Sequence, residues 1–64
     1  MGKSKKEINK IAETLWDIEV KIDNGSMEMK DAIPKIESIA STCSLEELLL
    51  IDAIIYQKHS EART

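Results

Sequence analysis

The chain has 64 residues, of which 12 are acidic, nine are Lys or Arg, one is cysteine and one is histidine, and its formal net charge is −3. A chain this short forms one domain at most and buries only a modest core. Cys43 is the single cysteine, so a disulfide within the chain is excluded. One cysteine and one histidine, His59, also cannot supply the four Cys or His ligands of a structural zinc site. Regular helices and self-association remain as the means of stabilising so small a domain.

The charge is unevenly distributed along the chain. Residues 1–12 carry four lysines and one glutamate, whereas residues 13–52 carry ten acidic residues against three lysines. Nucleic-acid affinity rests largely on Lys and Arg, so this acidic body makes nucleic acid an unfavourable partner, and we expect the N-terminal lysines to be solvated. No signal-peptide pattern and no apolar run of about 20 residues occurs, so we expect no membrane association and, with a lone cysteine, a cytoplasmic location.

A first helix is predicted over residues 4–23. Ser4 and Glu7 form the capping-box pattern, in which each side chain satisfies a free backbone N–H of the other residue. Asn24 and Gly25 tolerate the left-handed backbone found at helix ends and predict the C-terminus. Two apolar stripes follow at helical spacing, the main one through Ile8, Ile11, Leu15, Ile18 and Ile22 and a second through Ala12, Trp16 and Val20.

A second helix is predicted over about residues 27–40, with an apolar stripe through Met29, Ile33, Ile36 and Ala40 and with Ala32 and Ile39 beside it. Pro34 lies inside this segment and removes one backbone hydrogen bond. We therefore expect either a kink at Pro34 or a later start near Asp31 that places the proline in the first turn.

A third helix is predicted over residues 45–59, opened by a second capping box at Ser44 and Glu47. The three short helices, with antiparallel neighbours because the connections are short, form a single all-α domain over residues 1–64, and residues 1–3 and 60–64 are expected to fray.

Apolar side chains occur on all sides of the third helix. Leu48, Leu50, Ile51, Ile54 and Ile55 lie on one face, and Leu45, Leu49, Ala53 and Tyr56 lie on the opposite face. A helix that is apolar all round must be covered all round, and two other short helices are too few to do so. The economical solution is a homodimer that packs the third helix and part of the first against their copies. The alternatives are a monomeric bundle with the third helix at its centre and a patch reserved for a different, unidentified protein.

The residues expected at this interface include Trp16 as the first anchor and Tyr56 as the second, because aromatic side chains dominate interface energetics. The full predicted set is Trp16, Val20, Leu45, Leu49, Leu50, Ala53, Ile54 and Tyr56.

Three polar residues are candidates for the same interface. Asp52, Tyr56 and His59 follow at steps of four and three and form one line on the helix. An acid–base pair of Asp52 and His59 is one interpretation. The favoured interpretation is a rim carboxylate bonded to Tyr56, a lysine or the partner chain, because no nucleophile or metal cluster accompanies it. Glu19 is expected either to extend its carboxylate past the apolar stripes to water or to pair with a lysine across the interface, which would help to fix the register.

The segment from Ser44 to Leu48, followed by the apolar run 51–55 and the polar residues 57–59, resembles the last helix of small accessory proteins of temperate phages, above all those of the exo–xis region of lambdoid phages. These are short helical proteins that tend to dimerise, so the resemblance implies a regulatory binder, and it offers no catalytic residues to carry over to this chain. The same segment is similar to the Spo0E-type aspartyl-phosphate phosphatases of sporulating bacteria, whose signature is Ser-Gln-Glu-Leu-Asp. Here Leu49 and not Asp follows Leu48, and Leu45 stands where Gln would be, so the acid that the phosphatases carry is missing.

Taken together, these patterns predict a small non-enzymatic regulatory or inhibitory protein that acts by protein–protein binding, without cofactor or metal. A nucleic-acid-associated regulator that uses the basic N-terminus and an aspartyl-phosphate phosphatase are the alternatives. No phosphate-binding glycine loop, paired-histidine motif or serine elbow occurs in the chain.

Overall fold

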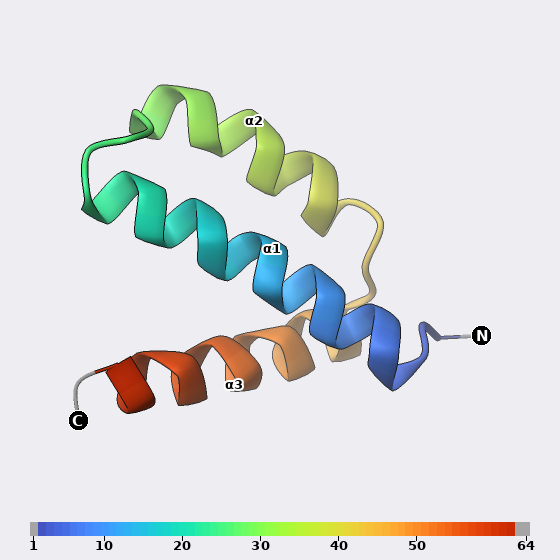
Figure 1. Ribbon diagram of the computed structural model, residues 1–64. Coiled ribbons are helices and arrows are strands. Elements are labelled where there is room, and N and C mark those ends of the chain that lie inside the picture. Colours follow the sequence, from blue (N-terminus) through green and yellow to red (C-terminus); the bar gives the residue numbers. More distant parts are fainter. Residues whose placement is uncertain (1, 63–64) are drawn as a thin grey trace.

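The computed structural model describes residues 2–62, which form three helices, α1 (Lys5–Asp23), α2 (Met29–Ala40) and α3 (Leu45–Ala62) (Figure 1). No strand occurs among these described residues, and the predicted all-α class is confirmed. The helix ends agree with the predicted ones to within a few residues, the largest difference being at the end of α3, predicted at residue 59. Residues 1, 63 and 64, where fraying was expected, lie outside the described residues.

Both ends of α1 are set by local hydrogen bonds. The Ser4 hydroxyl accepts from the Glu7 N–H at 3.2 Å, and the Glu7 carboxylate accepts from the Ser4 N–H at 3.4 Å, which is the predicted capping box. At the other end, Gly25 adopts a positive φ of 83°, and the Ser26 N–H then reaches the Lys21 carbonyl at 2.8 Å. This 6→1 bond is typical of a glycine-terminated helix and explains why the chain reverses there.

The structure resolves the two alternatives for α2. The helix begins at Met29, and Pro34 lies inside it rather than in its first turn. The predicted apolar stripe is displaced, because Ala32 is fully buried whereas Met29 and Ile33 are 60% and 48% exposed. The small side chain of Ala32 allows α2 to approach α1 closely, so this residue, and not the larger ones beside it, lies at the centre of the packed face.

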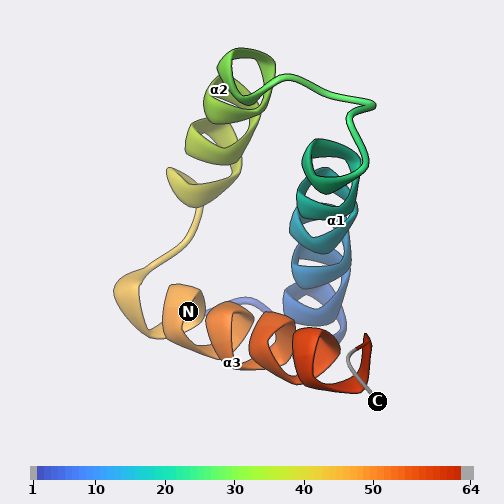
Figure 2. The same ribbon diagram turned by 90° about the vertical axis from the view of Figure 1, so that its left-hand side faces the viewer.

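The three helices form an open arrangement rather than a closed bundle. α1 packs against both α2 and α3, whereas α2 and α3 make little contact with each other. Figure 2 shows α2 and α3 standing apart, joined through the segment 41–44. The Cα atoms accordingly spread over 37 × 30 × 16 Å. The alternative of a bundle with the third helix at its centre is therefore wrong, because α1 is the helix that both others contact.

The core is correspondingly small and lies where α1 and α3 cross. Ile8 and Ala12 of α1 and Ile51 of α3 form its buried centre, and Ile51 is only 2% exposed. The half-buried side chains packed around this centre are Ile11, Leu15, Cys43, Ile54 and Ile55.

The N-terminal segment is tied to the start of α3. Glu47 accepts hydrogen bonds from the backbone N–H of Lys3 at 2.6 Å and of Ser44 at 2.8 Å, and the Lys3 ammonium lies 3.5 Å from the same carboxylate. The Lys3 ammonium also donates to the Thr42 carbonyl. The backbone hydrogen bond from Lys3, followed by the one from Ser44, lowers the pKa of Glu47 from 4.5 to about 2. Lys3 is thus held in place although residues 1–3 were expected to fray, and residues 60–62 continue α3.

Candidate functional site

The outer face of α3 carries a continuous strip of exposed apolar side chains. Leu45, Leu49 and Tyr56 are 74%, 63% and 76% exposed, and Ala53 is also exposed. Steps of four, four and three residues bring these four side chains onto one line along the helix, here called the α3 strip. Leu50, which is 57% exposed, lies beside it. The surplus of apolar surface expected from the sequence is therefore present on this face.

The α3 strip is exposed because of the way α3 packs. Ile51 is turned to α1, and Ile54 and Ile55 are half-buried against the same core. The strip lies on the opposite side of the helix, where no other part of the described chain covers it. Among the predicted interface residues, Ile54 thus belongs to the core side of α3 and not to its exposed side.

Trp16 and Val20 do not join the α3 strip. They line a separate cleft of about 660 Å³, and the C-terminal halves of α1 and α3 and the start of α2 supply its lining residues. Figure 1 shows the C-terminal halves of α1 and α3 diverging from each other. The cleft is lined by Trp16, Glu19, Val20, Ile22, Asp23, Asn24, Met29, His59 and Ala62.

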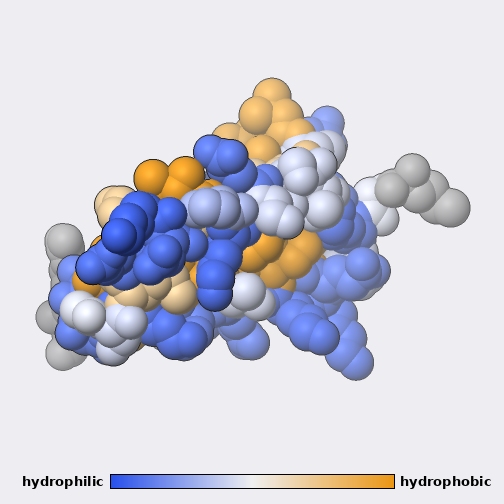
Figure 3. Space-filling view, turned by 90° about the horizontal axis from the view of Figure 1, so that it is seen from above, coloured by the Kyte–Doolittle hydropathy of each residue, from blue (hydrophilic) through white to orange (hydrophobic). Residues whose placement is uncertain are grey.

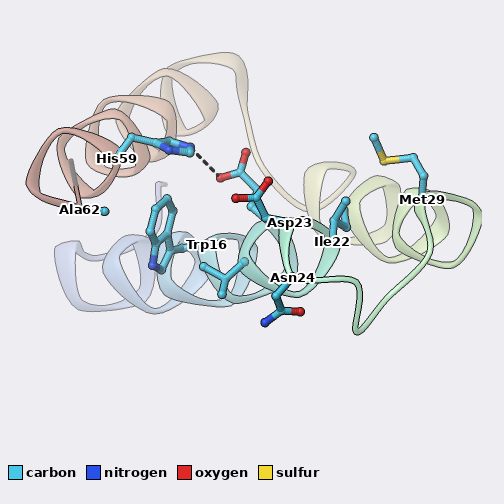
Figure 4. A pocket seen from close by; sticks show the side chains of 9 residues that line it. Trp16, Ile22, Asp23, Asn24, Met29, His59 and Ala62 are labelled. Atoms are coloured by element: carbon cyan, nitrogen blue, oxygen red, sulfur yellow. Dashed lines mark ion pairs between the residues drawn. The ribbon is translucent and has the colours of Figure 1, made fainter.

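Two candidate polar residues meet in the cleft. His59 Nε2 lies 3.4 Å from Glu19 Oε2, and the imidazole also packs edge-on against the Trp16 indole, with ring centroids 4.6 Å apart (Figure 4). Glu19 was expected to pair with a lysine; its partner here is His59. The sequence did not place this pair together, since its members lie on helices at opposite ends of the chain.

The predicted polar line on α3 is not formed. Within residues 2–62, no hydrogen bond joins Asp52 to Tyr56 or to His59, and all three side chains are exposed. Asp52 is not among the residues that line the cleft, where Glu19 and His59 meet.

Five lining residues of the cleft were not among the predicted interface residues: Ile22, Asp23, Asn24, Met29 and Ala62. A signal for the acidic one existed, because Asp23 follows Glu19 at i+4 and so shares its side of the helix. Met29 had been placed on the packed stripe of its own helix, and only the displaced packing of α2 leaves it open.

The remaining reactive groups are not gathered into a further site. In the part of the chain that the structure describes, no three side chains of His, Cys, Asp and Glu are placed to hold a metal ion. The half-buried Cys43 thiol donates to the Ile39 carbonyl at 3.5 Å. None of the helices, as far as residues 2–62 go, is both long and apolar enough to cross a membrane.

Figure 3 shows the face seen from above, where apolar residues reach the surface in separate patches between hydrophilic ones. No protein-family model, no curated protein and no solved structure matches the chain. The functional proposals below therefore rest on the surfaces of the chain itself.

Proposed function

We propose that this chain is a small non-enzymatic regulatory or inhibitory protein that acts by protein–protein binding and self-associates as a homodimer through α3. The observation that carries the proposal is the α3 strip, in which Leu45, Leu49 and Tyr56 are each more than three-fifths exposed. Contiguous apolar surface of this kind marks protein interfaces, because leaving it in water is unfavourable. The unidentified target of the regulator then binds elsewhere on the chain.

A second copy is the simplest cover for the α3 strip. From Leu45 to Tyr56 the strip extends about 16 Å along the helix at about 1.5 Å per residue. Two such strips related by a two-fold axis bring the same apolar side chains face to face, so that one surface serves both copies. The exposed Leu50 widens the contact, and Asp52 and Glu46 at its margins keep the rim polar.

Sedimentation of the intact chain at micromolar concentration tests the self-association. We expect a mass near twice the 7.2 kDa of the chain, and a dissociation to monomer on dilution. A monomer at every concentration up to about 1 mM, which corresponds to a binding free energy of about 4 kcal/mol, would remove the dimer from the proposal.

We further propose, as finer features of the same assembly, that helices neighbouring in sequence run antiparallel and that the protein acts in the manner of the temperate-phage accessory proteins that its last helix resembles. Both follow from the short connections and the residue pattern of α3. A pull-down from the native host with the intact chain as bait tests the regulatory role, and a chain that retains no protein would count against it.

Nucleic-acid binding through the N-terminal lysines is the second candidate function. Lys5, Lys6 and Lys10 are exposed at the start of α1, whereas Lys3 is engaged by Glu47 and the Thr42 carbonyl. Three free lysines beside an acidic body give only a small electrostatic footprint. Binding that falls steeply with salt and disappears on removal of residues 1–6 would favour this candidate over the first.

A further inference from the structure

The cleft between α1, α2 and α3 is a second surface, separate from the α3 strip, with a composition of its own. Its lining is apolar at Trp16, Val20, Ile22 and Met29, and its acidic residues are Asp23 and Glu19, the second of which pairs with His59. No lysine or arginine occurs among the lining residues described. A cleft of about 660 Å³ with this lining has room for a few apolar side chains flanked by cationic ones.

The two carboxylates are available to a ligand. Glu19 is 44% exposed and uses only its Oε2 atom toward His59, and neither its Oε1 atom nor Asp23 has a hydrogen-bond or ion-pair partner within residues 2–62. Asp23 is the last residue of α1. A helix C-terminus carries a partial negative charge, so the end of α1 adds to the field of the two carboxylates.

The apolar part of the lining is equally accessible. Met29 is 60% exposed and Val20 is 39% exposed, and both line the cleft together with the half-buried Trp16. A methionine is flexible and polarisable and adapts to varied apolar side chains, and tryptophan is enriched where interfaces are anchored. Figure 4 shows that the side chains lining the cleft come from all three helices.

We propose that this cleft is the docking site for a short cationic amphipathic helix of a partner protein. Its apolar side chains pack against Trp16, Val20 and Met29, and its lysine or arginine side chains reach Glu19 and Asp23. The charge of the lining decides the choice of occupant, because an acidic or neutral segment would leave Asp23, and the Glu19 oxygen that His59 does not contact, without a counter-charge. The inference rests on the proposed role of the chain as a binding protein but not on its self-association.

Fluorescence of the intact chain tests the proposal directly, because Trp16 is its only tryptophan and lines the cleft. The probes are two synthetic peptides of about four helical turns, one of leucine and lysine and one with glutamate in place of every lysine. We expect the lysine peptide to shift the Trp16 emission saturably and to bind at least about tenfold more tightly than the glutamate peptide. Raising the salt to about 1 M, where the screening length is about 3 Å, should remove most of this difference.

A double variant, Glu19→Gln with Asp23→Asn, isolates the two carboxylates. It should weaken the lysine peptide by at least about threefold, as the loss of two partly exposed ion pairs implies. Glu13→Gln with Glu37→Gln removes the same charge from exposed positions outside the cleft and should leave the affinity unchanged. Met29→Ala, at an exposed position, tests the apolar contact in the same titration and should also weaken binding.

Equal affinity for the two peptides, or no emission change with either at about 1 mM, overturns the proposal. So does an emission shift caused by raising the concentration of the protein alone, because a second copy would then occupy the cleft. If the chain is a monomer and binds the lysine peptide, the cleft proposal is supported and the homodimer proposal is contradicted. If the chain is a dimer and binds neither peptide, the homodimer proposal is supported and the cleft proposal is contradicted.

Discussion

Substituting Leu49 with Asp separates the stability of the fold from the stability of the homodimer. Leu49 is 63% exposed and lies in the middle of the α3 strip, so the fold of one copy depends little on it. The main intramolecular cost is the lower helix propensity of Asp, about 0.5 kcal/mol. We therefore expect the circular dichroism spectrum of Leu49→Asp to match that of the parent chain.

The cost to the homodimer is much larger. Burying a whole leucine side chain contributes about 1.5–3 kcal/mol, so the exposed part of Leu49 contributes roughly 1–2 kcal/mol in each copy. A two-fold axis counts this contribution twice, giving roughly 2–4 kcal/mol per dimer. At about 1.4 kcal/mol for each factor of ten, the dissociation constant rises roughly 30- to 700-fold, before any cost of burying the new carboxylate.

Sedimentation equilibrium over a concentration series measures this change. Asn9→Asp is the matched control, because it adds the same charge at an exposed position of α1, away from the α3 strip. We expect Asn9→Asp to dissociate at nearly the parent concentration. A folded Leu49→Asp with the dissociation constant of the parent chain would show that the α3 strip is not the interface.

Three further predictions concern the fold that presents these surfaces. Because Ile51 is only 2% exposed, Ile51→Ala should lower the free energy of unfolding measured in urea by about 2–5 kcal/mol, which is much of the total for a chain this short. Ile51→Val removes less of the buried side chain and should lower it by about 0.5–1.5 kcal/mol, and equal losses for the two variants would show that Ile51 is not at the centre of the core. Because the pKa of Glu47 is lowered from 4.5 to about 2, its ionised carboxylate stabilises the fold above pH 4.5, and this stabilisation is lost as the pH falls from 4.5 to about 2. Glu47→Gln should therefore be less stable than the parent chain near neutral pH, and urea melts at a series of pH values should show the difference shrinking between pH 4.5 and about 2. A difference that stays constant over this range would contradict the assigned pKa. Gly25→Ala should lower stability by about 1–2 kcal/mol through its positive φ alone, since no atom lies within 4 Å of the added Cβ, and Gly25→Asn should lose less; the reverse order in thermal melts would count against a backbone cause.

The helices and most of their ends could be predicted from the sequence because the forces that set them are local. Ser4 finds its capping partner three residues away at Glu7, and Gly25 ends α1 through bonds to the preceding turn. The presence of apolar side chains on all sides of α3 could also be predicted from the sequence, since helical spacing alone assigns Leu45, Leu49 and Tyr56 to one face.

Only the tertiary structure decided which apolar surfaces stay open and which distant residues meet. Ala32 rather than Met29 faces α1 because close helix packing favours the smaller side chain, and this choice exposes Met29 at the cleft. His59 reaches Glu19, and Lys3 reaches Glu47 across 44 positions of sequence, through the crossing of α1 and α3. Such contacts depend on the angle and register at which two helices pack, and those are set by the fit of many side chains at once, which no local pattern of residues records.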